Sequence, residues 1–203
     1  MSLEQQQAVL ARLLTDATFR QRWLKNPHAL DPSTGLSPDE HHLLSSLPAE
    51  LLTYQAQALL NKRRQELQKL LPLTFRGLGE NARTLHAQFA ETYLPTGLTP
   101  HRTEALQFAH WLRQHTQQDR PLPPELGELA RYEAALLAGY EPGRWGGLHH
   151  FALHLQDWKQ GLEAGQSVAQ LRHSIRPGKT LLLWMRLGQH GILRRWLISS
   201  RRP

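Results

Sequence analysis

The 203-residue sequence contains no cysteine, which excludes a disulfide framework, a thiol nucleophile and a thiolate metal site. It also lacks an apolar run of about 18 residues, the length of a membrane span. The first residues, MSLEQQQAVLARLLTD, do not place a basic segment before an apolar one. We therefore expect neither a membrane span nor a secretory signal, and we expect a soluble cytoplasmic protein.

Acidic residues are missing from the last part of the chain, beginning at Leu171. The same stretch holds eight basic residues: Arg172, Arg176, Lys179, Arg186, Arg194, Arg195, Arg201 and Arg202. The other 16 of the 24 basic residues and all 17 acidic residues come earlier, so the whole net charge of +7 arises from this end. Such a local excess of positive charge predicts an anionic partner.

Motifs of catalysis and of metal binding are also missing. The sequence has no HExxH and no GxSxG, and Arg76-Gly77-Leu78-Gly79 lacks the third glycine and the Lys-Ser/Thr ending of phosphate loops. The densest histidine group is His149, His150 and His154. On a helix, His150 and His154 would have metal-chelating spacing, but on the strand that we expect they are about 13 Å apart. We expect no catalysis, metal or cofactor, and an enzyme that uses these histidines is the third alternative.

Helix-start signals dominate the first 140 residues. We expect Asp16 to be the N-cap between a helix from Leu3 to Leu14 and a short helix ending at Lys25. Ser37-Pro38-Asp39-Glu40 has the pattern of a capping box with proline at the first helical position, and it predicts a helix to about Ser46.

Further helices follow from the 3.6-residue apolar period and from proline and glycine at the ends. We expect them at Pro48 to Leu71, Leu73 to Gly79, Glu80 to Tyr93, Pro100 to Gln114 and Pro124 to Ala138. Together they predict a helical domain over residues 1–140, with 1–47 and 48–140 as possible sub-modules.

The period changes after Tyr140 to Gly147, YEPGRWGG, the best domain boundary in the chain. Phe151, Leu153 and Leu155 alternate with polar or small residues, which predicts a strand of about eight residues. A short helix from Gln166 to His173 and two apolar runs around Gly188-Gln189-His190-Gly191 complete the pattern. The runs, Thr180 to Leu187 and Ile192 to Ser199, predict an antiparallel hairpin.

The predicted fold is mostly α, an N-terminal multi-helix domain followed by a small α+β module over residues 148–203. We expect this module to have β-α-β-β order and to end in the hairpin. The candidate partner-binding residues all come from it: Arg172, Arg176, Lys179, Trp184, Arg186, Arg194, Arg195 and Trp196. The alternatives are a core position for Trp184, Met185 and Trp196, since a small module needs large side chains, and a solvated face for the arginines.

A family resemblance is carried by spaced apolar, aromatic and basic positions over about residues 50–140. These positions are Leu60-Asn61-Lys62-Arg63, Lys69-Leu70-Leu71-Pro72, Leu78-Gly79, Phe89, Tyr93, Phe108, Leu112 and Leu129-Ala130-Arg131-Tyr132-Glu133. The pattern resembles the bacterial family labelled putative DNA-binding domain, whose members are encoded beside multinuclear non-haem iron oxidative enzymes and include a partner protein of methanobactin biosynthesis. The resemblance implies a non-catalytic companion that binds a ribosomally made precursor peptide, the oxidative enzyme in a heterodimer, or both.

Two functions from different classes follow. In the first, an extended peptide adds as a strand to the terminal hairpin while basic side chains select its acidic residues. In the second, the basic C-terminal region binds nucleic acid by neutralising phosphates. We rank the peptide or enzyme partner above nucleic acid, because the basic helix from Asn61 to Lys69 also carries Glu66 and needs its apolar side for packing.

Overall fold

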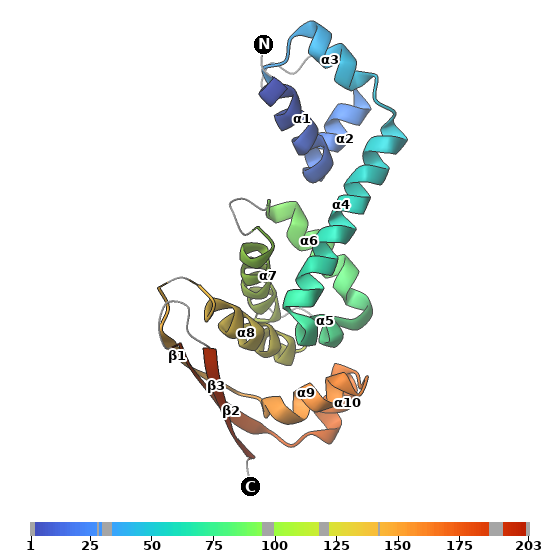
Figure 1. The fold of residues 1–203 in the computed structure, drawn as a ribbon. Coiled ribbons are helices and arrows are strands. Elements are labelled where there is room, and N and C mark those ends of the chain that lie inside the picture. The colour runs from blue at the N-terminus through green and yellow to red at the C-terminus, as the bar shows by residue number, and fades with distance from the viewer. Residues whose placement is uncertain are drawn as a thin grey trace. The chain divides into compact units, whose positions relative to one another are not determined.

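The computed structural model describes residues 3–27, 29, 34–94, 100–117, 122–141, 143–186 and 193–201. The chain is mostly α, with a small antiparallel sheet at its C-terminal end, which confirms the predicted fold class (Figure 1). The predicted hairpin loop at 188–191 lies outside the described residues, as does Arg202. Within the described ranges, no helix is both long and apolar enough to cross a membrane.

The chain forms two compact units. One comprises Met1–Gln65 with Ala90–Leu94, and the other comprises Glu66–Phe89 with Pro95–Pro203. These units are divided within helices and not at the glycine-rich stretch, so the boundary near residues 140–148 stays a prediction.

The first unit contains α1 (Leu3–Thr15), α2 (Ala17–Lys25), α3 (Pro38–Ser45) and most of α4 (Ala49–Leu70). Asp16 caps α2 by accepting the Phe19 N–H at 2.8 Å, and Ser37 and Glu40 form the predicted capping box of α3. The apolar core of this unit consists of Val9, Leu13, Phe19, Trp23, Leu36 and Leu44. Both predicted helix starts are thus confirmed.

The second unit begins with the end of α4, followed by α5 (Pro72–Leu78), a 3-10 turn (Gly79–Asn81) and α6 (Ala82–Thr92) as far as Phe89. It continues with α7 (Pro100–Gln117) and α8 (Pro124–Ala138). Phe108 of α7 is fully buried, with its ring centroid 5.5 Å from that of Phe75 and 5.3 Å from that of Phe89. These aromatic contacts hold α5, α6 and α7 around one core.

A carboxylate from α8 caps the start of α5. Leu71 stands at the N-cap position of α5 and provides no side-chain oxygen. Glu133 supplies one instead: it accepts the backbone N–H groups of Leu73 and Thr74 at 2.7 and 2.8 Å and the Thr74 hydroxyl at 2.7 Å. A buried glutamate therefore serves as a cap from 60 residues away in the sequence.

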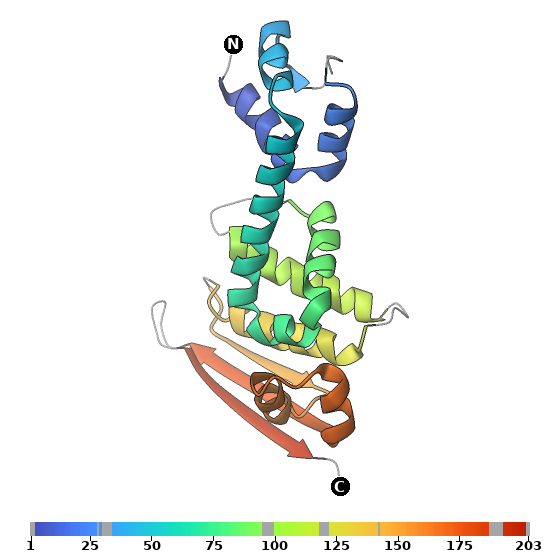
Figure 2. The same cartoon turned by 90° about the vertical axis from the view of Figure 1, so that its right-hand side faces the viewer.

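The C-terminal part contains β1 (Gly146–Phe151), α9 (Leu155–Glu163), α10 (Val168–Ser174), β2 (Gly178–Arg186) and β3 (Leu193–Arg201). The three strands form one antiparallel sheet in the order β1-β2-β3, so β3 lies at an edge (Figure 2). The predicted hairpin is confirmed as β2 and β3, but the order is β-α-α-β-β, with one more helix than we expected.

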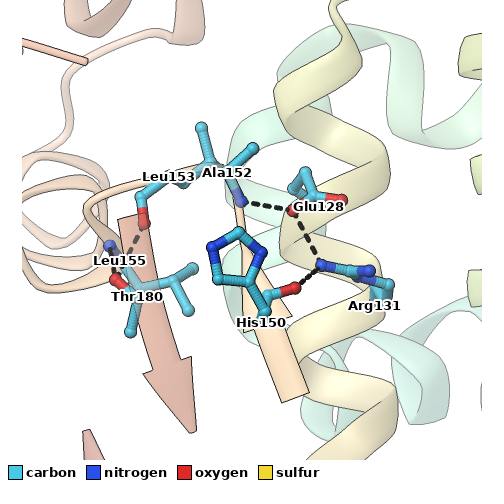
Figure 3. Close-up of polar contacts among 7 residues, drawn as sticks. All are labelled: Glu128, Arg131, His150, Ala152, Leu153, Leu155 and Thr180. Carbon is cyan, nitrogen blue, oxygen red and sulfur yellow. Dashed lines mark hydrogen bonds and ion pairs between the residues drawn. The ribbon is translucent and has the colours of Figure 1, made fainter. Parts of the chain in front are cut away.

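The first strand was predicted in the wrong place. It begins at Gly146 and ends at Phe151, and Leu155, which we placed in the strand, begins α9. The hydroxyl of Thr180 explains the change of direction, because it donates to the Leu153 carbonyl at 2.7 Å and accepts the Leu155 N–H at 3.0 Å (Figure 3). Leu153, His154 and Leu155 are all buried, so the burial does not alternate as it would in a strand with one solvated face.

Helix α8 is attached to the end of β1 by two charged side chains. Glu128 accepts the Ala152 N–H at 2.9 Å and pairs with Arg131 at 3.0 Å, and Arg131 donates to the His150 carbonyl (Figure 3). The Arg131 guanidinium also lies 4.6 Å from the centre of the Phe151 ring. These contacts fix one face of the sheet against α8.

The register of the strands divides the sheet into two faces. Thr180, Leu182 and Trp184 of β2 are buried, and they define the inner face, which also includes Phe151 of β1. Phe151 meets Tyr132 of α8 edge to face, with ring centroids 5.8 Å apart. The alternate residues of each strand point to the opposite, outer face.

Candidate partner-binding surface

The outer face of the sheet carries three cross-strand rows of side chains, which we call the outer sheet face. Directly opposite residues lie on the same face of an antiparallel sheet, so the register assigns each row. The rows are Gly146, Met185 and Arg194; Leu148, Leu183 and Trp196; and His150, Leu181 and Ile198. Lys179 of β2 and Ser200 of β3 lie opposite each other on the same face, at its end, and we include them in the outer sheet face.

Most side chains of this face are apolar, and several of them are exposed, whereas Leu181 and Leu183 on the central strand are half-buried. Leu148 is 65% exposed and Ile198 64%, while Met185 and Trp196 are 44% and 43% exposed. The open face of an antiparallel sheet normally carries polar side chains, because apolar side chains that stay in contact with water do not contribute the free energy of hydrophobic burial. A contiguous exposed apolar patch bordered by polar groups is typical of an interaction site.

Strand β3 is exposed on both of its faces. All five residues from Arg194 to Ile198 are exposed, including Arg195 and Leu197, which the register places on the inner side. Leu193 approaches α8, because a Cβ atom at Gly139 would stand 3.2 Å from its side chain. The positive charge of Arg195 opposes the rise that burial causes in the pKa of Tyr132, so Arg195 also lies on the α8 side. Residues 194–198 thus form an uncovered segment.

One hydrogen bond between β2 and the residue before β1 determines which backbone N–H and C=O groups of β3 point toward β2. The Arg186 N–H donates to the Trp145 carbonyl at 2.8 Å, so Arg186 directs its backbone groups toward β1. Backbone groups point alternately to the two sides of a strand, so Met185, Leu183 and Leu181 direct theirs toward β3. Their partners Arg194, Trp196 and Ile198 bond to β2. Arg195, Leu197 and Ser199 therefore present their N–H and C=O groups at the edge of β3 that pairs with no strand among the described residues, which we call the free edge.

The predicted partner-binding residues divide into two groups. Trp196, Arg194 and Lys179 lie on the outer sheet face, and Arg195 lies beside them on the edge strand. Trp184 does not belong to this surface, since it is 1% exposed and its indole lies over Gly147. Trp184 therefore lies in the core, which is the alternative that we gave for it.

The remaining predicted basic residues lie away from the outer sheet face. Arg172 of α10 pairs with Glu125 of α8 at 3.0 Å. Arg176 is exposed in the connection between α10 and β2. Arg186 is half-buried at the end of β2. The charge excess seen in the sequence is therefore spread over several parts of the second unit.

The three clustered histidines point in different directions. His150 is exposed on the outer sheet face, and His149 lies on the inner side, where burial lowers its pKa. His154 is buried before α9, with its Nδ1 atom 3.0 Å from the Asp157 carboxylate. Across the described ranges, no three His, Cys, Asp or Glu residues gather in a way that could hold a metal ion.

Sequence reasoning missed the apolar members of the surface, namely Leu148, Leu181, Leu183, Leu197 and Ile198. A signal for them exists in the last strand, where Trp196, Leu197 and Ile198 are consecutive apolar residues. A strand with one solvated face would alternate, so three apolar residues in a row indicate that both faces of β3 need cover.

Comparison with known proteins gives one family match. The model of the SCO6045-like, C-terminal domain family matches residues 46–114, about a third of the chain. This range covers α4 to α6 and most of α7, and it ends before the sheet. No curated protein and no solved structure matches this chain. The resemblance to partners of iron oxidative enzymes stays a prediction.

Proposed function

We propose that this protein is a non-catalytic partner protein that binds an acidic, partly apolar polypeptide through the outer sheet face and the edge strand β3. The observation that carries the proposal is the exposure of five consecutive residues, Arg194 to Ile198, on an edge strand. Two are basic and three are large and apolar. Natural proteins usually protect such an edge, and an unprotected one is a site where another chain can pair.

The chemistry of the surface favours a polypeptide over a bare polyanion. Trp196 and Ile198 are exposed on the outer face, and burying their apolar area against a ligand would stabilise the complex. The arginines at the border, Arg194 and Arg195, attract acidic side chains and orient them. In keeping with the resemblance, the ligand that we propose is a precursor peptide or a segment of the oxidative enzyme that modifies it.

Nucleic acid fits this arrangement less well. Arg194 and Arg195 lie on opposite faces of the sheet, and Arg172 is paired with Glu125. Phosphate tracking needs basic side chains along one continuous groove, whereas here apolar side chains separate them. The test of the proposal therefore includes DNA, and preferential DNA binding is the competing outcome.

The proposal is tested by comparing three labelled probes at low and at moderate salt. The probes are a random copolymer of glutamate and tyrosine, a random copolymer of lysine and tyrosine, and a short DNA duplex. We expect the glutamate copolymer to bind most tightly at moderate salt. DNA binding should fall by nearly one log unit per log unit of salt for each phosphate contacted.

Charge reversal locates the binding surface. Arg194→Glu with Arg195→Glu should weaken binding of the glutamate copolymer by about tenfold or more, equivalent to about 1.4 kcal/mol. Arg83→Glu with Arg113→Glu is the matched control, since both residues are exposed on helices of the same unit and the change in net charge is equal. Tight DNA binding at moderate salt without copolymer binding would contradict the proposal.

A further inference from the structure

The exposed segment of β3 has a fixed order of side chains, two arginines followed by three apolar residues. Arg194 and Arg195 come first, and Trp196, Leu197 and Ile198 follow. Because consecutive residues of a strand point to opposite faces, Arg194 lies on the outer face and Arg195 on the inner face. Consecutive residues of an added strand also point to opposite faces, so two consecutive acidic residues match the two arginines one to one.

The free edge also has a fixed pattern of backbone groups. Arg195, Leu197 and Ser199 direct their N–H and C=O groups away from β2, as the alternation from the Arg186–Trp145 bond requires. A strand added there would form hydrogen-bonded pairs at these three positions. Its side chains would stand directly opposite those of β3, on the same faces.

From these two patterns we infer that the ligand is a polypeptide segment of three apolar residues followed by two acidic residues, added antiparallel to β3. The apolar residues lie opposite Ile198, Leu197 and Trp196, and the acidic pair lies opposite Arg195 and Arg194. The antiparallel direction continues the pairing of the existing sheet and is slightly more stable than the parallel one. This inference rests on the proposed function and specifies the order of residues in its ligand.

A second copy of the chain is a poorer occupant. The sequence from Leu171 onward contains eight basic residues and no acidic residue, so two β3 edges would bring together surfaces of the same charge. Repulsion of this kind disfavours self-pairing, and it selects a strand that carries acidic residues.

The order of residues is tested with three peptides in the same blocked, soluble frame. The first contains Val-Leu-Val-Glu-Glu, the second has the same composition in alternating order, Val-Glu-Leu-Glu-Val, and the third contains Val-Leu-Val-Lys-Lys. We expect the first to bind about tenfold more tightly than the second, and the third not to bind. Equal binding of the first two would overturn the inferred order while leaving the proposed function intact. Failure of both acidic peptides to exceed the lysine peptide would overturn both.

The backbone pattern is tested with two neighbouring prolines. Leu197→Pro removes an N–H at the free edge, whereas Ile198→Pro removes one that bonds to β2. We expect the Leu197→Pro variant to have nearly the same melting temperature as the Leu197→Ala variant. We expect it to bind the first peptide about tenfold more weakly than Leu197→Ala does. We expect Ile198→Pro to lower the melting temperature. The reverse result, stable Ile198→Pro and unfolded Leu197→Pro, would overturn the assigned edge.

N-methylated peptides repeat this test without a change to the protein. A methyl group on the leucine nitrogen of Val-Leu-Val-Glu-Glu blocks the N–H opposite Leu197, and we expect it to abolish binding. A methyl group on either neighbouring valine nitrogen should be tolerated, because those N–H groups point away from β3. Equal loss at all three positions would overturn strand addition, and so would peptide-independent dimerisation through β3 in sedimentation experiments.

Discussion

Gly147 lies directly opposite Trp184 in the sheet, and a Cβ atom at Gly147 would stand 2.7 Å from Cε2 of the indole. The absence of a side chain at Gly147 is therefore what allows the indole to pack against the backbone of β1. Trp184 is 1% exposed, so a shift of the ring away from Gly147 would disturb the packed interior of the module. This pair fixes which face of β2 is buried and leaves the alternate residues for the outer sheet face.

We predict that Gly147→Ala destabilises the protein by about 1–3 kcal/mol, the usual cost of overpacking a filled site. Chemical unfolding measures the loss. In the Trp184→Leu background, which leaves space opposite residue 147, the same substitution should cost much less. An equal cost in both backgrounds would show that the strain does not come from the indole.

The Thr180 hydroxyl is the second contact that shapes the C-terminal module. We predict that Thr180→Val costs about 1–3 kcal/mol, because the Leu153 carbonyl and the Leu155 N–H lose their partner in a buried position. Ser199→Ala is the control, since it removes only the 2.9 Å contact between the two hydroxyls. A Thr180→Val variant as stable as Ser199→Ala would contradict the role of Thr180 in ending the first strand.

Glu133 makes the stability of the second unit depend on pH. Burial raises the pKa of Glu133 above its ordinary value of 4.5, although its hydrogen bonds with Thr74 and Leu73 act in the opposite sense. In the pH range between the two pKa values the folded state binds more protons than the unfolded state, so stability falls as pH rises.

The corresponding measurement is the unfolding free energy of the wild type minus that of Glu133→Gln, as a function of pH. We predict that this difference falls as pH rises from about 4.5 through the raised pKa and is constant above it. A difference that increases with pH over the same range would mean that the capping hydrogen bonds outweigh burial.

Much of the helical part could be predicted from local signals. Asp16, Ser37 with Glu40, and Pro124 mark helix starts within a few residues of the helices that they begin, and the structure places helices there. Such caps act over one turn, so the sequence contains the whole interaction.

The errors arose where the partner is distant in the sequence. Thr180 accepts the Leu155 N–H from 25 residues away, and nothing near Leu155 in the sequence indicates this hydrogen bond. Helix α9 was missed because Phe151, Leu153 and Leu155 alternate as in a strand, whereas Leu155, Trp158 and Leu162 share a helical period. The start of β1 was missed because Gly146 and Gly147 are unfavourable in strands unless a neighbour such as Trp184 requires the space.

The candidate surface was predicted in part, because charge is visible in the sequence and exposure is not. Arg194, Arg195 and Trp196 were chosen for charge and aromatic character, and they lie on the exposed strand. Trp184 was chosen on the same grounds, but the register turns it inward. A shift of one residue would exchange the faces, and only the pairing of all three strands determines which tryptophan is buried.

Strand addition at β3 is tested most directly by amide hydrogen exchange with and without the peptide that contains Val-Leu-Val-Glu-Glu. In the free protein we predict slow exchange at Trp196 and Ile198, whose N–H groups bond to β2, and fast exchange at Arg195 and Leu197. Saturating peptide should slow exchange at Arg195 and Leu197 and leave the other two nearly unchanged. Peptide binding that protects neither Arg195 nor Leu197 would contradict the account.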